Sequence, residues 1–452
     1  MNLHYLLSQR AAKCKPVRVG LIGAGKFGTM FLAQARLTPG IQVVAIADLE
    51  IQRAGDALRR TDWPAESMLT AQTSGDINDV AAAGHVALTE DAFALIESEL
   101  DVVIECTGSP EAGARHTLAA IDAKRHIVMV SVEADVLVGP LLREQAKQAG
   151  VVYSMAYGDQ PALVCEMVDW ARTCGFEVVA AGKGTKHLPE YHYSTPKTVF
   201  DYYGFSEQQV AEGDFNAKMF NSFLDGTKSA IEMAVIANAT GLVPQAEGLK
   251  FPPVGVDDLS KVLKPTADGG ILSHFGTVEV VSCLNRDGSA VERDLRWGVY
   301  VTIRAASEYV KQCFNQYGLR TDESGLYAAM YRPSHLIGLE LGISVASAAL
   351  RHEPTGTSEK FIGDVGTVAK RDLVAGETLD GEGGFTVFGK LLDAQTSLAR
   401  HILPLELASK VKLTHAVKKD QWLTYDDVEL DSNSIAVKTR RELEQNACVY
   451  QK

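Results

Sequence analysis

Four polar residues at helical spacing form the line of side chains best suited to acid–base chemistry: Asn221, Asp225, Lys228 and Glu232. They are four, three and four residues apart, so one helix over residues 217–239 would carry them on a single stripe. A lysine near two carboxylates is expected to stay cationic, which suits polarising a carbonyl oxygen and passing it a proton. We predict that Lys228, Asp225 and Glu232 are catalytic and that Asn221 binds substrate. The alternative is a ladder of surface ion pairs.

Two further lysines lie in a glycine-flanked stretch, Gly182-Lys183-Gly184-Thr185-Lys186-His187, which follows an apolar run at residues 176–181. The glycines predict a turn after a strand, and such a turn can present ammonium groups to an oxyanion or phosphate. We therefore add Lys183 and Lys186 to the predicted catalytic residues. The alternative is a plain β-turn with solvated lysines.

Arg332 and His335 flank Pro333 just ahead of an apolar segment, residues 336–350, that predicts a helix. A proline in the first turn is typical of a helix start. The two basic residues are predicted to bind an anionic group of the substrate. A core histidine satisfied by the backbone is an equally good interpretation of His335.

A glycine-rich motif near the N-terminus predicts a nucleotide site. Gly23, Gly25 and Gly28 fit G-x-G-x-x-G directly after the apolar run 17–22, and Asp48 ends a second apolar run 20 residues after Gly28. In a βαβ unit these glycines allow the turn, the approach of a pyrophosphate and helix packing, while the acid binds ribose hydroxyls. The alternative is a purely structural βαβ turn. The predicted cofactor-binding residues are Gly23, Gly25, Lys26, Phe27, Gly28, Asp48, Thr107, Gly108, Glu133, Gly158 and Asp159.

The acid at position 48 bears on which nucleotide is bound. An aspartate there usually repels a 2′-phosphate, which favours NAD, whereas Arg53 just beyond it could accommodate NADP. The sequence leaves both open.

The elements around these residues predict an α/β protein of three domains. Short apolar runs alternate with helical segments up to about residue 155, which is typical of a doubly wound Rossmann domain. Residues 61–84 are polar and are predicted to be an irregular surface insertion, and residues 276–307 an antiparallel hairpin. The predicted domains are an NAD(P)-binding domain (1–157), an α+β catalytic and dimerisation domain (158–354) and a small β-rich C-terminal domain (355–452).

The C-terminal part contains an internal repeat, in which residues 368–379 resemble residues 411–423. Both copies read as a strand, a charged turn and a short strand, followed by acidic residues. They mark a β-rich module over about residues 361–440. It holds no catalytic constellation, so we interpret it as a lid or assembly domain and expect a homodimer or a higher homo-oligomer.

Composition limits the partners. The formal net charge is −13 and there is no long basic run, which disfavours nucleic acid and anionic membranes but not a small anionic substrate. The 7 cysteines form no C-x-x-C pair, as expected for reduced thiols without a disulfide scaffold or zinc site. No signal peptide or membrane span is evident. We therefore predict a cytoplasmic protein and no metal-ligating residues.

Three stretches resemble homoserine dehydrogenase-like oxidoreductases: Glu105-Cys106-Thr107-Gly108, Val130-Ser131-Val132-Glu133-Ala134-Asp135 and Tyr157-Gly158-Asp159-Gln160-Pro161. The C-terminal repeat resembles a SAF domain. The combination is most similar to the 1-deoxy-D-xylulose 5-phosphate reductoisomerase-like (DRL) proteins, and the likeness covers nearly the whole chain.

The resemblance implies reduction with NADPH, with NADH as the alternative, of an aldehyde formed by rearranging a phosphorylated ketose. For 1-deoxy-D-xylulose 5-phosphate the product would be 2-C-methyl-D-erythritol 4-phosphate, in isoprenoid biosynthesis. The resemblance also makes Asp225 and Lys228 the counterparts of the catalytic Asp and Lys of homoserine dehydrogenases. The two residues are three positions apart here instead of four. A divalent metal requirement stays open. The alternatives are a dehydrogenase of another small hydroxy acid, semialdehyde or polyol phosphate, and a nucleotide-sensing binding protein.

Overall fold

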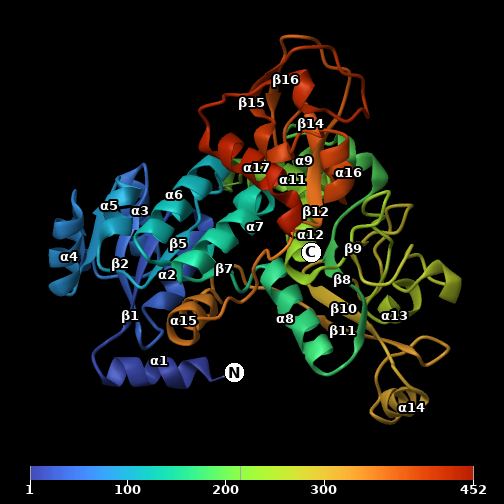
Figure 1. Cartoon of the computed structure of the whole chain (residues 1–452), viewed down its shortest axis with the longest axis horizontal. Coiled ribbons are helices and arrows are strands. Elements are labelled where there is room, and N and C mark those ends of the chain that lie inside the picture. The colour runs from blue at the N-terminus through green and yellow to red at the C-terminus, as the bar shows by residue number, and fades with distance from the viewer. Residues whose placement is uncertain (1, 214, 451–452) are drawn as a thin grey trace. The chain divides into compact units, whose positions relative to one another are not determined.

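The computed structural model describes residues 2–213 and 215–450, and the chain divides into two compact units (Figure 1). The first unit comprises residues 1–163, 336–359 and 434–443, and the second comprises residues 164–335, 360–433 and 444–452. The chain thus passes from one unit to the other five times, after residues 163, 335, 359, 433 and 443. Neither unit is one continuous stretch of sequence.

The first unit is built on a seven-stranded parallel sheet in the order β3-β4-β2-β1-β5-β6-β7. Its central strands consist of β-branched and other apolar residues that are almost entirely buried, as strands covered on both faces should be. The Rossmann prediction is confirmed. The strands are β1 (Val17–Ile22), β2 (Ile41–Ala47), β3 (Met68–Thr70), β4 (Val86–Thr89), β5 (Val102–Glu105), β6 (His126–Met129) and β7 (Tyr153–Met155).

Helices connect these strands, and two further helices of the first unit come from later segments of the chain, residues 336–359 and 434–443. The helix α15 packs on β1, β6 and β7, and α17 begins in the first unit. The helices are α1 (Leu3–Ala12), α2 (Lys26–Ala35), α3 (Ile51–Arg60), α4 (Ser74–Ala82), α5 (Ala92–Glu97), α6 (Pro110–Asp122), α7 (Val132–Ala149), α15 (Gly342–Arg351) and α17 (Ile435–Gln445).

The predicted irregular insertion at residues 61–84 is wrong. It contains the short helix η1 (Ala65–Ser67), the edge strand β3 and the helix α4, which a Thr73–Asp76 capping box begins. Ile77 on α4 is fully buried. The polar residues of this segment therefore belong to helix caps and to the exposed face of α4. Because they dominate the segment, the sequence did not indicate the buried face of this helix.

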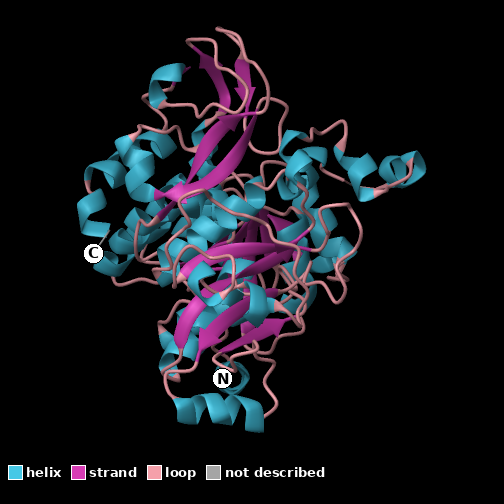
Figure 2. Ribbon diagram, turned by 90° about the vertical axis from the view of Figure 1, so that its right-hand side faces the viewer, coloured by secondary structure: helices cyan, strands magenta, loops and turns pink. Residues whose placement is uncertain are grey.

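The second unit contains a four-stranded sheet in the order β11-β10-β8-β9. Figure 2 draws the strands of the chain in magenta and its helices in cyan. β8 pairs in parallel with β9 and antiparallel with β10, so it lies between the two strands predicted to form a hairpin. That prediction is wrong for the long strands, although a local turn does form at Asn285–Gly288. The strands are β8 (Glu177–Thr185), β9 (Thr277–Ser282), β10 (Val299–Arg304) and β11 (Tyr327–Arg332).

The predicted lysine-bearing turn at residues 182–187 is also wrong in its first half, because β8 continues to Thr185. A Cβ at Gly182 would lie 1.9 Å from the carbonyl oxygen of Glu279, and one at Gly184 would lie 1.9 Å from that of Leu295. The glycines therefore permit close approach of neighbouring backbones within the sheet.

The single helix predicted over residues 217–239 is broken into α11 (Ala217–Leu224) and α12 (Thr227–Thr240). Gly226 adopts a φ of +87°, which ends the first helix and starts the second. The predicted helix at residues 336–350 likewise begins later, at Gly342, so Pro333 lies in a bend instead of a first turn.

Residues after 360 add two small sheets to the second unit. β12 pairs antiparallel with β14, and β13, β15 and β16 form a three-stranded sheet. The predicted β-rich character is confirmed, while the SAF identity and the three-domain division stay predictions. The strands are β12 (Gly363–Ala369), β13 (Thr378–Asp380), β14 (Val387–Asp393), β15 (Ser409–Leu413) and β16 (Val428–Glu429).

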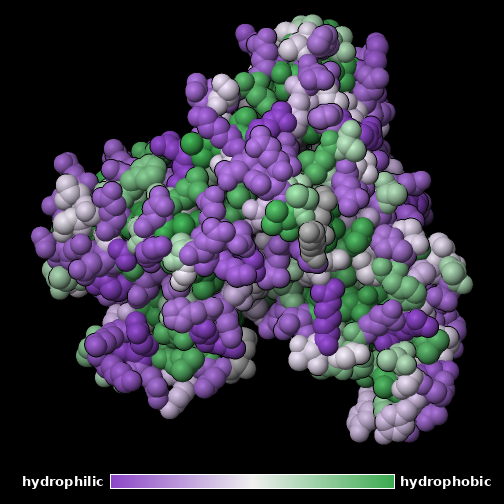
Figure 3. All heavy atoms as spheres, viewed as in Figure 1, coloured by the Kyte–Doolittle hydropathy of each residue, from purple (hydrophilic) through white to green (hydrophobic). Residues whose placement is uncertain are grey.

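The helices of the second unit include α8, whose first residues belong to the first unit. They are α8 (Gln160–Thr173), η2 (Pro189–Tyr193), α9 (Val199–Tyr203), α10 (Glu207–Glu212), α11, α12, α13 (Leu259–Val262), η3 (Thr266–Asp268), α14 (Glu308–Gln316), α16 (Ala394–Ala399), η4 (Leu405–Leu407), η5 (Tyr425–Asp427) and α18 (Ala447–Tyr450). Figure 3 shows hydrophilic residues over much of the visible face, with hydrophobic ones between them. Within the described residues, no helix has the length and apolar character of a membrane span.

Candidate functional site: a nucleotide loop and a buried polar cluster

The glycine loop of the first unit has the geometry expected of a pyrophosphate cradle. Gly23 has a φ of +98° and donates its N–H to Ala47 O at 2.8 Å, which holds the turn against β2. A Cβ at Gly28 would lie 2.5 Å from Gly23 O, so α2 packs closely on the turn. A Cβ at Gly25, the N-cap of α2, would meet no atom within 4 Å. The loop is thus packed on one side and open at Gly25, where a ligand can approach the helix N-terminus.

Asp48 fixes this loop from the end of β2. Its carboxylate accepts hydrogen bonds from Ala24 N at 2.8 Å and from Glu50 N at 2.9 Å. Arg53 Nη1 lies 3.8 Å from it. The predicted ribose-binding acid therefore also orders the loop, and a guanidinium group lies beside it. Lys26 is exposed and Phe27 is partly buried in the first turn of α2.

The end of β5 carries a buried carboxylate beneath the predicted residues Thr107 and Gly108. Glu105 accepts hydrogen bonds from the hydroxyls of Thr107 at 2.5 Å and of Ser131 at 2.8 Å. The Ser131 hydroxyl oxygen in turn accepts Gly108 N–H at 2.9 Å. This network holds Thr107 and Gly108 in an exposed position at the carboxyl edge of the parallel sheet, where ligands of such sheets bind.

Three further predicted cofactor residues lie in the first unit. Glu133 is in the first turn of α7. Gly158 has a φ of +94°, and a Cβ there would lie 2.8 Å from Leu336 O. Asp159 follows it and accepts Gln160 N–H at 2.9 Å. All eleven predicted cofactor residues thus lie in one compact unit, and their roles stay predictions.

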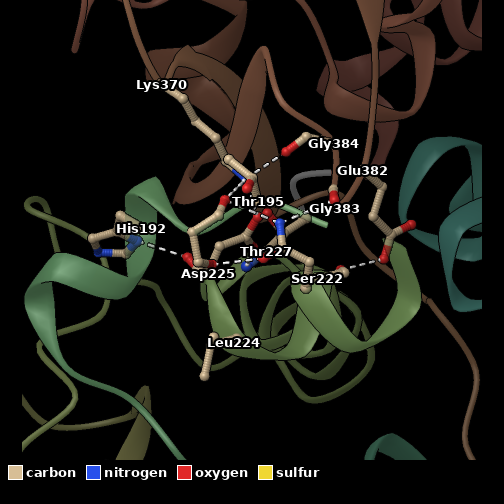
Figure 4. Close-up of polar contacts among 12 residues, drawn as sticks. His192, Thr195, Ser222, Leu224, Asp225, Thr227, Lys370, Glu382, Gly383 and Gly384 are labelled. Carbon is tan, nitrogen blue, oxygen red and sulfur yellow. Dashed lines mark hydrogen bonds and ion pairs between the residues drawn. The ribbon is translucent and has the colours of Figure 1, made fainter. Parts of the chain in front are cut away.

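The second unit contains a buried polar cluster at the break between α11 and α12 (Figure 4). The side chain of Asp225 is fully buried; it accepts Thr227 N–H at 2.9 Å and pairs with Lys370 Nζ at 2.7 Å. Lys370 also donates to Ser194 O and to Gly384 O, each at 2.8 Å. Lys370 is not among the predicted site residues, because in the sequence it belongs to the charged turn Lys370-Arg371-Asp372 of the C-terminal repeat.

Asn221 belongs to the same cluster. Its amide oxygen accepts Ser194 Oγ at 2.7 Å, and its amide nitrogen donates to Ser194 O at 3.1 Å and to Gly383 O at 3.0 Å. The carbonyl of Asp225 is paired with His192 Nδ1 at 2.7 Å. Burial lowers the pKa of His192, so the ring is favoured in its neutral form. The cluster joins residues 192–227 to residues 370–384.

The remaining residues of the stripe face other partners. Glu232 forms a buried ion pair with Lys183 of β8. Lys228, in the first turn of α12, is only partly buried, unlike Asn221, Asp225 and Glu232. Three of the four residues of the predicted stripe are therefore buried, and Lys228 is the more accessible one.

The other predicted basic residues gather at one end of the four-stranded sheet. Lys183 of β8 and Arg332 of β11 are both in register with Val299 of β10. Lys186 follows β8 directly and donates to the carbonyl of Tyr202. His335 Nδ1 lies 2.7 Å from Trp297 O. Within residues 2–213 and 215–450, no group of three or more His, Cys, Asp or Glu side chains is placed to hold a metal ion.

Two families match adjacent parts of the chain. Residues 19–155 match the NAD binding domain of homoserine dehydrogenase, and residues 158–341 match the catalytic domain of the oxidoreductase DRL. The two matched segments are those of an NAD(P)-dependent oxidoreductase. Among curated proteins no significant match to this sequence is found.

Solved structures of oxidoreductases resemble this one at low sequence identity. The 1-deoxy-D-xylulose 5-phosphate reductoisomerase of Zymomonas mobilis in complex with NADPH is 18% identical, with a TM-score of 0.33 over 48% of this chain and 57% of that one. The myo-inositol dehydrogenase of Lactobacillus casei with NAD(H) and myo-inositol is 19% identical, with a TM-score of 0.27 over 43% and 54%. The chain therefore spans only about half the length of these relatives.

Proposed function

We propose that this oxidoreductase uses NADPH to act on a small phosphorylated sugar. The favoured reaction is rearrangement and reduction of 1-deoxy-D-xylulose 5-phosphate to 2-C-methyl-D-erythritol 4-phosphate, a step of isoprenoid biosynthesis. The observation that carries this proposal is the match of residues 158–341 to the DRL catalytic domain, directly after an NAD-binding domain. The open face of the glycine loop at Gly25 supports nucleotide binding in the first unit.

The bound nucleotide would supply the hydride that reduces the substrate carbonyl. In the second unit we assign the proton to Lys228, because it is only partly buried, whereas Asp225, Glu232 and Lys183 are buried. Lys228 would orient the carbonyl through its ammonium group and give a proton to the oxygen as the carbon is reduced. Asp225, Glu232, Lys183 and Lys370 then act as the buried framework that positions the start of α12.

The test is an incubation of the purified chain with 1-deoxy-D-xylulose 5-phosphate and NADPH. We expect loss of NADPH absorbance together with a branched product that isotope labelling and NMR identify. In Lys228→Ala we expect single-turnover hydride transfer to slow by about a hundredfold or more, as for other general acids. A rate within a fewfold of wild type would remove Lys228 from the mechanism.

The preference for NADPH rests on Arg53. Its guanidinium is half-exposed and lies beside Asp48 and Glu50, where it can neutralise the acid that would repel a 2′-phosphate. We expect Arg53→Ala to weaken NADPH binding by about tenfold, the loss of a charge-assisted hydrogen bond, while NADH binding changes little. Fluorescence titration with both nucleotides measures this. Equal losses for the two nucleotides would contradict the assignment.

A second candidate is a dehydrogenase of another hydroxy acid, semialdehyde or polyol phosphate. The match of residues 19–155 to the NAD binding domain of homoserine dehydrogenase favours it. NADP⁺ reduction with such a substrate, without any rearranged product from deoxyxylulose phosphate, would select this reaction. Nucleotide binding without turnover on any phosphosugar would instead favour a sensing protein.

A further inference from the structure

Two cations of the second unit lie over one tyrosine ring. Lys186 follows the end of β8, and Arg296 lies just before β10. The two segments are joined by a hydrogen bond from Gly184 N to Gly298 O at 3.0 Å. Lys186 Nζ is 5.4 Å and Arg296 Cζ is 5.6 Å from the ring centroid of Tyr203, the last residue of α9. Three separate elements thus bring these side chains together.

Neither cation is paired with an acid among residues 2–213 and 215–450. In the part of the chain that the structure describes, no carboxylate oxygen lies within 4.0 Å of the Lys186 ammonium or the Arg296 guanidinium group. Both groups instead contact a carbonyl oxygen or aromatic rings. Lys186 donates to the carbonyl of Tyr202, and Arg296 stacks 4.7 Å from the ring centroid of Trp297. Asp294 accepts the backbone N–H of Arg296 at 2.8 Å. The buried lysines of this unit, Lys183, Lys264 and Lys370, are each paired with a carboxylate.

The two positive charges act on each other. Burial lowers the pKa of Lys186, and the charge of Arg296 lowers it further. Cys283 is buried near both: burial raises the pKa of its thiol, while Arg296 and Lys186 oppose that shift. Holding two like charges together in a partly desolvated place is unfavourable, and a bound anion would relieve this repulsion.

We propose that Lys186 and Arg296 form the site that binds the phosphate group of the substrate, with Tyr203 beside it. A guanidinium group can donate two parallel hydrogen bonds to a phosphate, and an ammonium group adds a compact charge. This assignment rests on the proposed action on a phosphosugar, and it adds Arg296, which the sequence did not indicate. It also makes Lys186 a binding residue instead of a catalytic one.

The test is binding of inorganic phosphate to the full chain, measured by calorimetry at constant ionic strength. We expect Lys186→Gln and Arg296→Gln each to weaken phosphate binding at least about tenfold, with partial recovery in Arg296→Lys. Arg304→Gln is the matched control, because Arg304 also lies over an aromatic ring, that of Phe275, at the other end of β10. It should bind phosphate as the wild type does.

A measurement of NADPH binding distinguishes loss of the phosphate site from misfolding and from loss of the nucleotide site. The affinity for NADPH should be unchanged in Lys186→Gln and Arg296→Gln, which shows that the folded protein is intact and that the phosphate does not belong to the nucleotide. The proposal is overturned if the wild type binds no phosphate, if both variants bind it within twofold of wild type, or if Arg304→Gln loses it equally. If the variants lose phosphate while deoxyxylulose phosphate is never turned over, the anion site stands and the proposed reaction falls.

Discussion

At the scale of single residues, two glycines of the same motif have opposite surroundings. A Cβ at Gly28 would collide with Gly23 O, whereas one at Gly25 would enter open space. We expect Gly28→Ala to lower the free energy of unfolding by about 1–3 kcal/mol through overpacking. Gly25→Ala should leave it within about 1 kcal/mol, yet weaken NADPH binding by about tenfold because its methyl group stands where the pyrophosphate approaches.

Chemical denaturation and nucleotide titration of the two variants measure these effects. The contrast tests the cradle directly, because each variant adds the same methyl group. Unchanged NADPH affinity in Gly25→Ala would mean that the nucleotide does not lie against this turn.

Loss of the Lys370 side chain is expected to lower the stability of the second unit. Its ammonium group contacts three oxygen atoms, including the fully buried carboxylate of Asp225. Lys370→Met would leave that carboxylate buried without a cation, for which we expect a loss of about 3–5 kcal/mol in the free energy of unfolding.

The control for Lys370→Met is Lys418→Met, which breaks an exposed pair with Asp372. Such surface pairs contribute only about 0–1 kcal/mol. The double variant Asp225→Asn with Lys370→Met should recover part of the loss, since it leaves no unpaired charge. A Lys370→Met loss no larger than that of Lys418→Met would show that the buried pair does not hold α11 and α12 to residues 370–384.

At the scale of elements, Glu279 joins β9 to the loop at residues 245–251. Its carboxylate accepts hydrogen bonds from Gln245 and from the backbone of Lys250, Phe251 and Val280. Burial raises the pKa of Glu279 from 4.5 to about 7, despite these donors. The folded state therefore binds the proton more tightly than the unfolded state does.

This pKa gives the stability a defined pH dependence. The contribution of Glu279 is present below about pH 4.5 and is lost as the pH rises through about 7, with a size on the order of 3 kcal/mol. Glu279→Gln has no such proton, so the difference in unfolding free energy between wild type and variant should change in favour of the variant from about pH 4.5 to about pH 8. Urea unfolding across this range measures it; a constant difference would contradict the raised pKa.

Local patterns predicted the parallel sheet well and the second unit poorly. The strand β1 agrees residue for residue with the run at 17–22, because a buried parallel strand needs a short apolar segment and nothing else. The helix break at Gly226 had a local signal in the glycine itself, but the groups that bind the break did not: Lys370 and Gly383 lie 145 and 162 residues from their partners Asp225 and Asn221. Likewise, β8 lies between β9 and β10 in the sheet, and the sequences of β9 and β10 contain no pattern that predicts this order.

The same distinction applies to the candidate site. The cofactor residues follow from one local motif and the ends of successive strands, so the sequence places them in one unit. Arg296 and Lys370 become notable only through the partners that the fold gives them: a second cation near Arg296 and a buried acid beside Lys370.

At the scale of the whole molecule, Glu111 binds the start of the segment 434–443, which returns to the first unit. Its carboxylate accepts hydrogen bonds from Ser434 Oγ at 2.6 Å, Ile435 N at 3.1 Å and Ala436 N at 2.9 Å, so it caps the start of α17. Burial raises the pKa of Glu111, but these bonds outweigh it and the net pKa is lowered. This stabilisation is therefore present above about pH 4.5 and is lost as the pH falls.

We expect Glu111→Gln to cost about 0.5–2 kcal/mol, as for the loss of other helix caps, and to speed hydrogen exchange in residues 435–445. The exposed Glu97→Gln is the control. Exchange that stays as slow as in wild type would show that other contacts, such as Arg440 Nη1 to Leu137 O at 3.2 Å, hold the helix without the cap.

The five passages of the chain between its units have a consequence for biosynthesis. The nucleotide-binding unit takes its last segment from residues 434–443. A ribosome must therefore synthesise the chain through residue 443 before this unit can close, and the Rossmann sheet emerges first without the helices α15 and α17 that pack with it. Nascent chains of this protein should consequently depend on chaperones for longer than those of a dehydrogenase whose nucleotide domain is one uninterrupted N-terminal segment.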